Sequence, residues 1–121
     1  MQKLGKREEQ IMQVIWQLEE AYIKDVIEAL PEPKPHYNTV ATMVKILTDK
    51  GFLQAEKLGN TFRYSPLVKL ADYRQQDVAT IKQKYFGNSF TKMMTHFAKE
   101  ENLSHEELDE LVRLIKSQKN S

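Results

Sequence analysis

The chain has 121 residues, a formal net charge of +1 and no cysteine. This length allows one domain or two very small ones, and the missing cysteines exclude structural disulfides and zinc-thiolate sites. No segment approaches the roughly 20 apolar residues that a bilayer span needs, and residues 1–6 lack the apolar core of a secretory signal. We therefore expect a cytoplasmic protein that does not insert into a membrane.

The first predicted helix covers residues 6–18. Its apolar residues recur at helical spacing and form a stripe typical of one buried helix face. We expect this helix to support a small three-helix core. The predicted stripe consists of Ile11, Val14, Ile15 and Leu18, flanked by Met12 and Trp16.

A second helix is predicted within residues 22–30, where Ile23, Val26, Ile27 and Leu30 share one face. Three prolines, at positions 31, 33 and 35, then remove amide donors and disfavour helix in the residues before them. Residues 31–35 are therefore predicted to connect this helix to the next one.

The third predicted helix runs from about residue 36 or 38 to Lys50, and Gly51 is suited to ending it in the left-handed conformation. Its inward face is predicted to carry Val40, Met43, Val44 and Leu47. The opposite face begins with short polar side chains, which allow a helix to enter a DNA major groove. This outward set is Asn38, Thr39, Ala41, Thr42, Lys45, Ile46 and Asp49.

Residues 52–57 and 61–64 favour β-strands around the turn residues 58–60, which predicts a hairpin. Helix, turn, helix and hairpin in this order indicate a winged helix-turn-helix over residues 1–66, a fold that commonly binds DNA. Lys57 and Arg63 are either phosphate contacts or solvated charges, and Asn60 is either a turn former or a contact.

Residues 67–121 are predicted to form three amphipathic helices, over about 67–86, 90–98 and from 104. Ser104 and Glu107 have the spacing of a capping box. These short helices enclose little core alone, so we expect a helical region that dimerises with a second copy. The predicted interface residues are Tyr73, Ile81, Tyr85, Phe90, Met93, Met94, Phe97, Leu108, Leu111 and Ile115, with Val112 on the same face as the last three.

Eight segments together resemble the penicillinase-repressor family of BlaI-, MecI- and CopY-type regulators. The resemblance extends over nearly the whole chain. The segments are Ile11-Met-Gln-Val-Ile-Trp16, Val26-Ile-Glu-Ala-Leu30, Tyr37-Asn-Thr-Val-Ala-Thr42, Leu47-Thr-Asp-Lys-Gly51, Tyr64-Ser-Pro-Leu67, Phe86-Gly-Asn-Ser-Phe90, His96-Phe-Ala-Lys99 and Leu103-Ser-His-Glu-Glu107.

The resemblance implies a homodimeric repressor on double-stranded operator DNA with two-fold symmetry. It also implies that Tyr37, Asn38, Thr39, Thr42 and Lys45 contact the DNA. Many relatives carry a basic residue where this chain has Ile46, so the contact made there by those relatives is not carried over.

In the β-lactam branch of the family, proteolysis in the dimerisation region relieves repression after a membrane metalloprotease-type sensor detects antibiotic. The matching bond in this chain is His96–Phe97, where relatives typically have asparagine before the phenylalanine. The copper-responsive branch uses a cysteine cluster, and this chain has no cysteine.

An alternative is a winged-helix module that binds protein and does not read DNA sequence. The nearly neutral charge is compatible with it. Tyr73 and Tyr85 are either packing residues or the lining of a small-molecule site. We expect no enzyme activity, metal or cofactor, because the sequence lacks a phosphate-binding loop, metal-ligand spacing and a nucleophile with a base.

Overall fold

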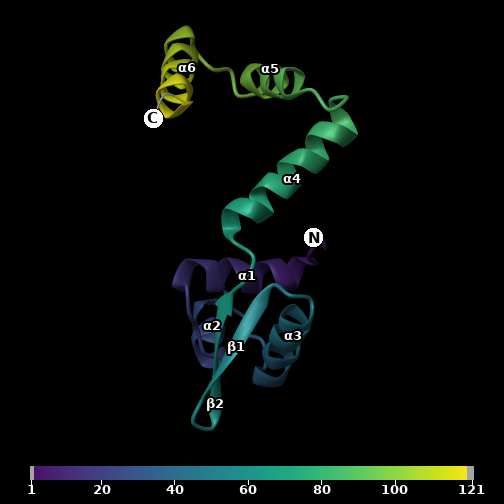
Figure 1. Cartoon of the computed structure of the whole chain (residues 1–121), viewed down its shortest axis with the longest axis vertical. Coiled ribbons are helices and arrows are strands. Elements are labelled where there is room, and N and C mark those ends of the chain that lie inside the picture. Colours follow the sequence, from purple (N-terminus) through teal and green to yellow (C-terminus); the bar gives the residue numbers. More distant parts are fainter. Residues whose placement is uncertain (1, 120–121) are drawn as a thin grey trace. The chain divides into compact units, whose positions relative to one another are not determined.

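The computed structural model describes residues 2–119, which form six helices and one two-stranded antiparallel sheet (Figure 1). These residues separate into two compact units that meet between Gln76 and Asp77, within the fourth helix. Each unit is described by itself. The elements are α1 (Lys6–Leu18), α2 (Ile23–Ala29), α3 (Tyr37–Asp49), β1 (Leu53–Leu58), β2 (Thr61–Pro66), α4 (Leu70–Tyr85), α5 (Phe90–Glu100) and α6 (His105–Lys119).

Helix α1 has the predicted bounds, and Glu8 stabilises its start by accepting a 2.9 Å hydrogen bond from the Gly5 amide. Ile11 and Ile15 are fully buried, as the apolar stripe predicts. The prediction for Leu18 was wrong, because this side chain is 44% exposed whereas Met12 is fully buried. Leu18 is the last residue of the helix, next to Glu19, which has a φ of 71°.

Helices α2 and α3 form the predicted helix-turn-helix, and residues 30–36, which include the predicted connection 31–35, join them. Val40, Val44 and Leu47 are buried along one side of α3, and Met43 packs partly buried against them. The helix ends before Gly51, which has a φ of 86°. An L-residue with a side chain rarely adopts this φ, so glycine suits the position.

Strands β1 and β2 form the predicted hairpin, with Leu58 paired to Thr61 across a two-residue turn. Gly59 in this turn has a φ of 66°. The second strand continues through Pro66, beyond the predicted end at Tyr64. Ala21 and Tyr64 exchange backbone hydrogen bonds of 2.9 and 2.8 Å, so the segment between α1 and α2 joins the open edge of β2.

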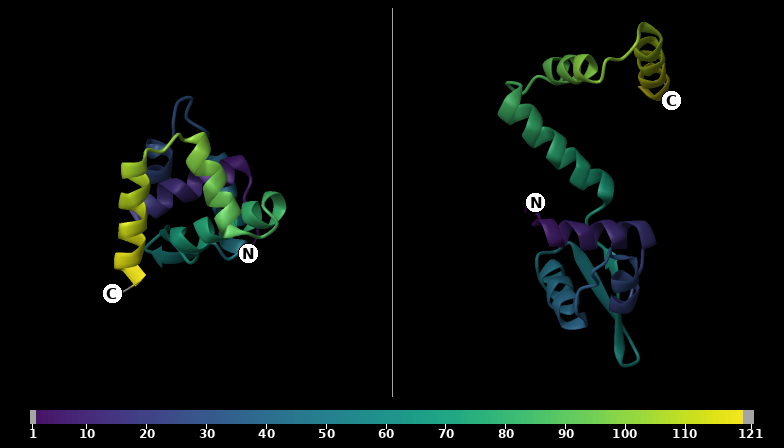
Figure 2. Two further views of the ribbon diagram at one scale, coloured as in Figure 1. Left: turned by 90° about the horizontal axis from the view of Figure 1, so that it is seen from above. Right: turned by 180° about the vertical axis from the view of Figure 1, so that it is seen from behind.

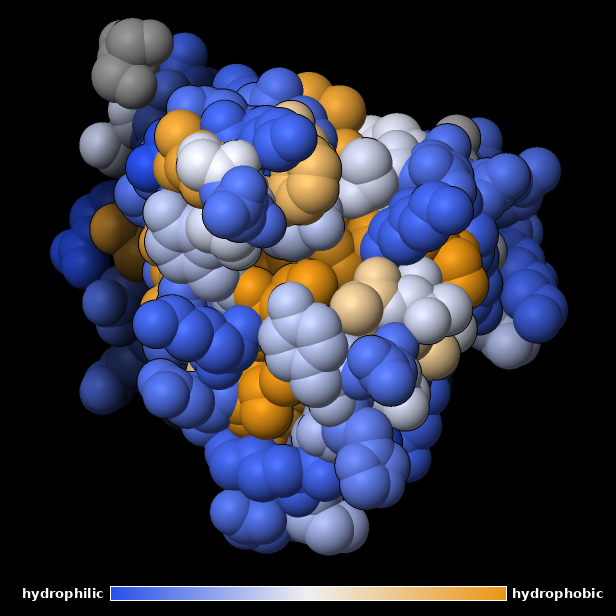
Figure 3. All heavy atoms as spheres, turned by 90° about the horizontal axis from the view of Figure 1, so that it is seen from below, coloured by the Kyte–Doolittle hydropathy of each residue, from blue (hydrophilic) through white to orange (hydrophobic). Residues whose placement is uncertain are grey.

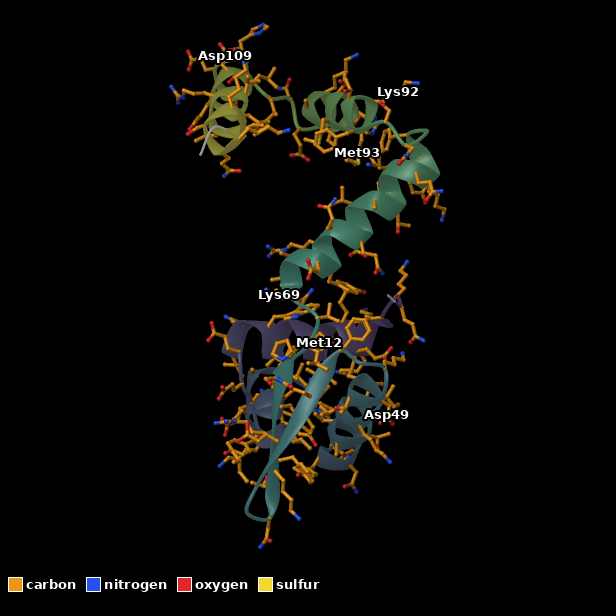
Figure 4. The ribbon with its side chains drawn as sticks, viewed as in Figure 1. Met12, Asp49, Lys69, Lys92, Met93 and Asp109 are labelled. Carbon is orange, nitrogen blue, oxygen red and sulfur yellow. The ribbon has the colours of Figure 1, made fainter. Side chains whose placement is uncertain are left out.

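The core of the N-terminal unit lies between α1, the hairpin and the helix-turn-helix. The hairpin is the wing of this fold, and the turn at residues 59–60 is its tip. Helix α1 crosses the opposite end of the hairpin in both the front and the back view (Figures 1 and 2). Met12 projects from α1 into this interior (Figure 4). The buried side chains come from all of these elements, so the core positions α3 and the hairpin relative to each other.

Tyr73, in the first turns of α4, completes this core and is only 4% exposed. Its hydroxyl accepts a 3.1 Å hydrogen bond from the Leu4 amide, and its ring lies 5.5 Å from Trp16 and 6.0 Å from Phe52. The Trp16 indole donates a 2.8 Å hydrogen bond to the Val68 carbonyl. Residues beyond Pro66 are therefore part of the same core.

In the C-terminal unit, residues 86–89 separate α4 from α5, and Gly87 and Asn88 have positive φ. The predicted capping box precedes α6: Ser104 Oγ accepts from the Glu107 amide at 3.1 Å, and the Ser104 amide donates to the Glu107 carboxylate at 3.4 Å. No helix among residues 2–119 has the length and apolar character to cross a membrane.

Candidate nucleic-acid interface

The outer face of α3 presents a row of polar side chains. Asn38, Thr42 and Lys45 follow one another at helical spacing and are exposed, so they project from one face. Thr39 is exposed beside them, and Ala41 is half-buried. This face combines short hydrogen-bonding groups with a cation, as contact with base edges in a DNA groove requires.

The N-terminal ends of α2 and α3 meet the start of β2 at a shallow hollow of about 330 Å³. Tyr37, predicted as a DNA contact, lies here with Thr61 of the hairpin. Tyr22 and Lys24 also line it and were missed by the sequence analysis. The first helix of a helix-turn-helix commonly crosses the DNA backbone, so the motif as a whole, and no local pattern, could have directed attention to the start of α2.

Burial raises the pKa of the Tyr64 hydroxyl above its usual value of 10.0, and the nearby Tyr37 hydroxyl raises this pKa further. Both effects oppose the formation of a phenolate, which would repel phosphate. Tyr64 consequently keeps its proton and acts as a hydrogen-bonding or packing group beside the hairpin.

The hairpin separates Lys57 and Arg63, the two cations that the sequence analysis considers as phosphate contacts or solvated charges. Residues directly opposite in an antiparallel pair lie on the same side of the sheet, and neighbours alternate. Arg63 is opposite Glu56 and Lys57 is opposite Phe62, so Lys57 and Arg63 project from opposite faces of the wing. Asn60 is exposed at the tip between them.

Arg63 differs from Lys57 in its immediate partners. Its Nη1 lies 3.1 Å from a carboxylate oxygen of Glu20, and its Nη2 lies 3.2 Å from one of Glu56. Lys57 forms no ion pair with another residue of the described part of the chain. The positive charge of Lys57 is thus available to an outside ligand, whereas that of Arg63 is matched by two carboxylates.

Figure 3 shows the molecule from the side of the wing tip: hydrophilic residues (blue) surround a hydrophobic band (orange). Tyr37, Ile46 and Phe62 are among the exposed large apolar residues of α3 and the hairpin. The predicted site on this unit is therefore a mixed surface whose cations are few. Its attraction for DNA must depend strongly on each of them.

Apolar side chains that are exposed in the single chain distinguish the C-terminal unit. Phe97 of α5 and Leu111 of α6 are 41% and 38% exposed, and both line a hollow of about 350 Å³ between these helices. Leu108 lines the same hollow and is half-buried. Ile81, Tyr85, Phe90, Met94, Val112, Leu114 and Ile115 are exposed as well.

Two residues predicted for the dimer interface are already covered within the chain. Tyr73 belongs to the core of the N-terminal unit, so it is removed from the expected interface. Met93 is 4% exposed, whereas the neighbouring Lys92 is exposed (Figure 4 labels both). Sequence periodicity alone cannot tell which core an apolar helix residue joins.

His96 and Phe97 lie within α5, and their rings form an aromatic cluster with Phe86. The ring centroids are 5.4 Å apart for Phe86–His96, 5.8 Å for Phe86–Phe97 and 5.3 Å for His96–Phe97. The bond between His96 and Phe97 is helical, so a protease that binds extended chain requires local unfolding of α5.

The sequence pattern of the penicillinase repressor family matches residues 4–117. The penicillinase repressor of Bacillus licheniformis is 27% identical over 119 residues, which cover 98% of this chain and 93% of that protein. The solution structure of the DNA-binding domain of the repressor BlaI is 31% identical, covers 60% of this chain and 94% of its own, and has a TM-score of 0.52. The Bacillus licheniformis BlaI monomer in complex with the blaP half-operator is 30% identical, with a TM-score of 0.50, covering 60% of this chain and 89% of its own.

Proposed function

Because the chain belongs to the penicillinase repressor family, we propose that this transcriptional repressor acts as a homodimer on a two-fold symmetric DNA operator. The exposed polar face of α3 is the observation that carries the proposal, since it combines small hydrogen-bonding groups with a cation. The complex of the related BlaI with a half-operator supports DNA as the ligand of this unit.

In the proposed complex, α3 enters the major groove. Asn38, Thr39 and Thr42 contact base edges, and Ala41 permits close approach. Tyr37 and Lys45 contact the sugar–phosphate backbone on either side of them. Lys57, Asn60 and Arg63 bring the wing to the neighbouring backbone or minor groove, where the cations release counterions from the DNA.

Dimerisation is supported by the exposed apolar side chains of the C-terminal unit. An apolar surface of this kind is costly in water, and pairing with a second copy would cover it. A two-fold dimer also presents two α3 helices to the DNA, and half-sites about 34 Å apart fit one helical turn. The site on DNA and the stability of the repressor would then depend on one interface.

Relief of repression is proposed to follow proteolysis at or near His96–Phe97, after a membrane metalloprotease-type sensor responds to a β-lactam. Cleavage there would divide the apolar surface of α5 and weaken the dimer. We expect slow cutting of the free dimer because α5 must open first. Recovery of intact chain alone from antibiotic-treated cells, read by mass spectrometry, would contradict this mode of induction.

The proposed function is tested by selecting bound duplexes from a random library at about physiological salt, followed by footprinting of the selected sequence. We expect a two-fold motif with half-sites about one helical turn apart. Enrichment of a single half-site would contradict the dimer. No enrichment at any salt would contradict sequence-specific repression and favour a module that binds protein.

Since a repressor of this kind acts on DNA, we propose the cytoplasm as its location.

A further inference from the structure

The wing cation Arg63 is held by two acidic side chains from different parts of the fold. Glu56 is its directly opposed residue on β1, and Glu20 comes from the segment between α1 and α2. Each carboxylate takes a different end of the guanidinium, at 3.1 and 3.2 Å. A single guanidinium therefore faces two negative charges.

The fold brings Glu20 to this position. Glu19 ends α1 with a φ of 71°, and the next residue but one, Ala21, forms a β-bridge with Tyr64 on β2. Glu20 is consequently carried between a helix end and a bridge, next to the strand that bears Arg63. The pairing joins residues 43 positions apart and is produced by tertiary structure, not by a local charge pattern.

We propose that Glu20 and Glu56 determine DNA specificity by competing with phosphate for Arg63. This inference rests on the proposed DNA-binding function. On DNA without a matching sequence, the carboxylates keep Arg63 occupied and repel nearby phosphates. At the operator, base contacts from α3 fix the wing against the backbone, and a phosphate replaces the carboxylates.

The exposure of the three side chains makes this exchange feasible. Arg63 is 33% exposed, and Glu20 and Glu56 are 57% and 61% exposed. Ion pairs with this access to water contribute little to stability, so a well-placed phosphate can displace them. A buried pair would hold Arg63 too firmly to be exchanged.

The test is a comparison of wild type with the double variant Glu20→Gln, Glu56→Gln on a 20-base-pair duplex of random sequence. Glutamine keeps the shape and removes both negative charges. One cation made available to phosphate steepens the slope of log affinity against log salt by about 0.9. We expect this change and a roughly fivefold to tenfold gain in affinity near 0.1 M salt.

A comparison of Arg63→Gln alone with Arg63→Gln combined with both glutamate substitutions separates the effect on Arg63 from a general loss of negative charge. In an Arg63→Gln background, the two glutamate substitutions should no longer steepen the salt slope. Glu28→Gln, an exposed carboxylate on α2, is the matched control and should leave the slope at its wild-type value. The fluorescence of the single tryptophan, Trp16, reports whether each variant is folded.

Each outcome decides the proposal. A steeper slope that requires Arg63 supports it. An unchanged slope, or the same increase with Arg63 replaced, overturns it while leaving the proposed DNA-binding function intact. Absence of binding to the random duplex by wild type and all variants at every salt concentration overturns the competition, whereas only failure to enrich a site in the library selection overturns the proposed DNA-binding function. Binding by the double variant alone supports competition in its strongest form.

Discussion

The carboxylate of Glu8 and the ammonium group of Lys50 lie 2.7 Å apart and join the first turn of α1 to the residue that ends α3. The same carboxyl group accepts the Gly5 amide at the start of α1. Helix α3 carries the proposed base contacts, so this pair fixes its far end to the supporting helix.

The Glu8 pair predicts an acid-dependent loss of stability. Its hydrogen bonds from Lys50 and Gly5 hold the pKa of Glu8 below its ordinary value of 4.5, although partial burial opposes them. A carboxyl with a lowered folded-state pKa stabilises the fold fully above the unfolded pKa, and this contribution is lost as pH falls through the lower folded pKa. Glu8→Gln should lower the free energy of unfolding by about 0.5–1 kcal/mol at pH 7.

Urea unfolding followed by Trp16 fluorescence measures this difference at several pH values. The wild type and Glu8→Gln curves should approach each other as pH falls below the ordinary value of 4.5 and should converge once it has passed the lower folded-state pKa of Glu8. Glu9→Gln removes a charge from the same helical turn and serves as the control. Equal losses for both variants would show that helix-end electrostatics, and not the Lys50 pair, carry the effect.

Replacing Thr42 should reduce binding at the selected operator more than at random DNA. If its side chain contacts a base, Thr42→Ala costs about 1–3 kcal/mol at the operator. Thr48→Ala is a matched control in the same helix, because the Thr48 hydroxyl donates to the Val44 carbonyl at 2.8 Å. Fluorescence anisotropy measures the affinity of each variant for both duplexes. If Thr42→Ala bound the operator and the random duplex with wild-type affinity, the assignment of Thr42 as a base contact would be wrong.

Lys45 and Lys57 should act on every sequence alike. As phosphate contacts, each would lower the magnitude of the salt slope by about 0.9 when replaced by glutamine. Lys69→Gln, just before α4, is the control and should leave the slope at its wild-type value. Titrations at four salt concentrations measure the slope. An unchanged slope for either variant would mean that the lysine replaced is a solvated surface charge and not a phosphate contact.

The C-terminal apolar surface should control the association of two chains. Leu111→Asn places an amide where the proposed interface buries a leucine in both copies. Since removal of one buried leucine side chain costs about 2–5 kcal/mol, the dimer dissociation constant should rise by at least about a hundredfold. Arg113→Asn, two residues along α6, projects from another side of the helix and should dimerise normally.

Sedimentation velocity over a range of concentrations distinguishes these variants. A dimer of unchanged affinity for Leu111→Asn would place the interface elsewhere. A monomeric wild type would contradict the dimer proposal itself.

Weakening the aromatic cluster should accelerate cleavage in α5. Phe86→Ala removes the ring that lies against both His96 and Phe97, so local opening becomes easier. We expect chymotrypsin to cut after Phe97 about twofold to tenfold faster, as mass spectrometry of timed samples would measure. Gln83→Ala, at an exposed residue of α4 outside the proposed interface, is the control. Equal cleavage rates in the wild type and Phe86→Ala would mean that the aromatic cluster does not protect α5 from proteolysis.

Local patterns predicted much of this fold because the signals are strong and short in range. The prolines at 31, 33 and 35 separate α2 from α3, and the spacing of Ser104 and Glu107 predicts the start of α6. Glycine at positions 51 and 59 has positive φ as the predicted helix end and turn require. The bounds of α1 agree with the predicted range.

Tertiary contacts explain what the patterns missed. Tyr73 has the spacing of an interface residue, but its ring packs on Trp16 and Phe52 in the N-terminal core. The partners of Arg63 depend on a β-bridge between distant segments. The hollow at Lys24 likewise forms only when two helix ends and a strand meet. None of these relationships has a signature within a few residues of sequence.

The extension of the core to Tyr73 determines where this protein can be joined to another. A fragment ending at Pro66 would lack the Val68 carbonyl that receives the Trp16 indole and the ring that covers Phe52. A fragment ending at Gln76 retains both. A fusion of the N-terminal unit to a different oligomerisation domain should therefore have its junction within α4. The first turns of α4 should come from this protein.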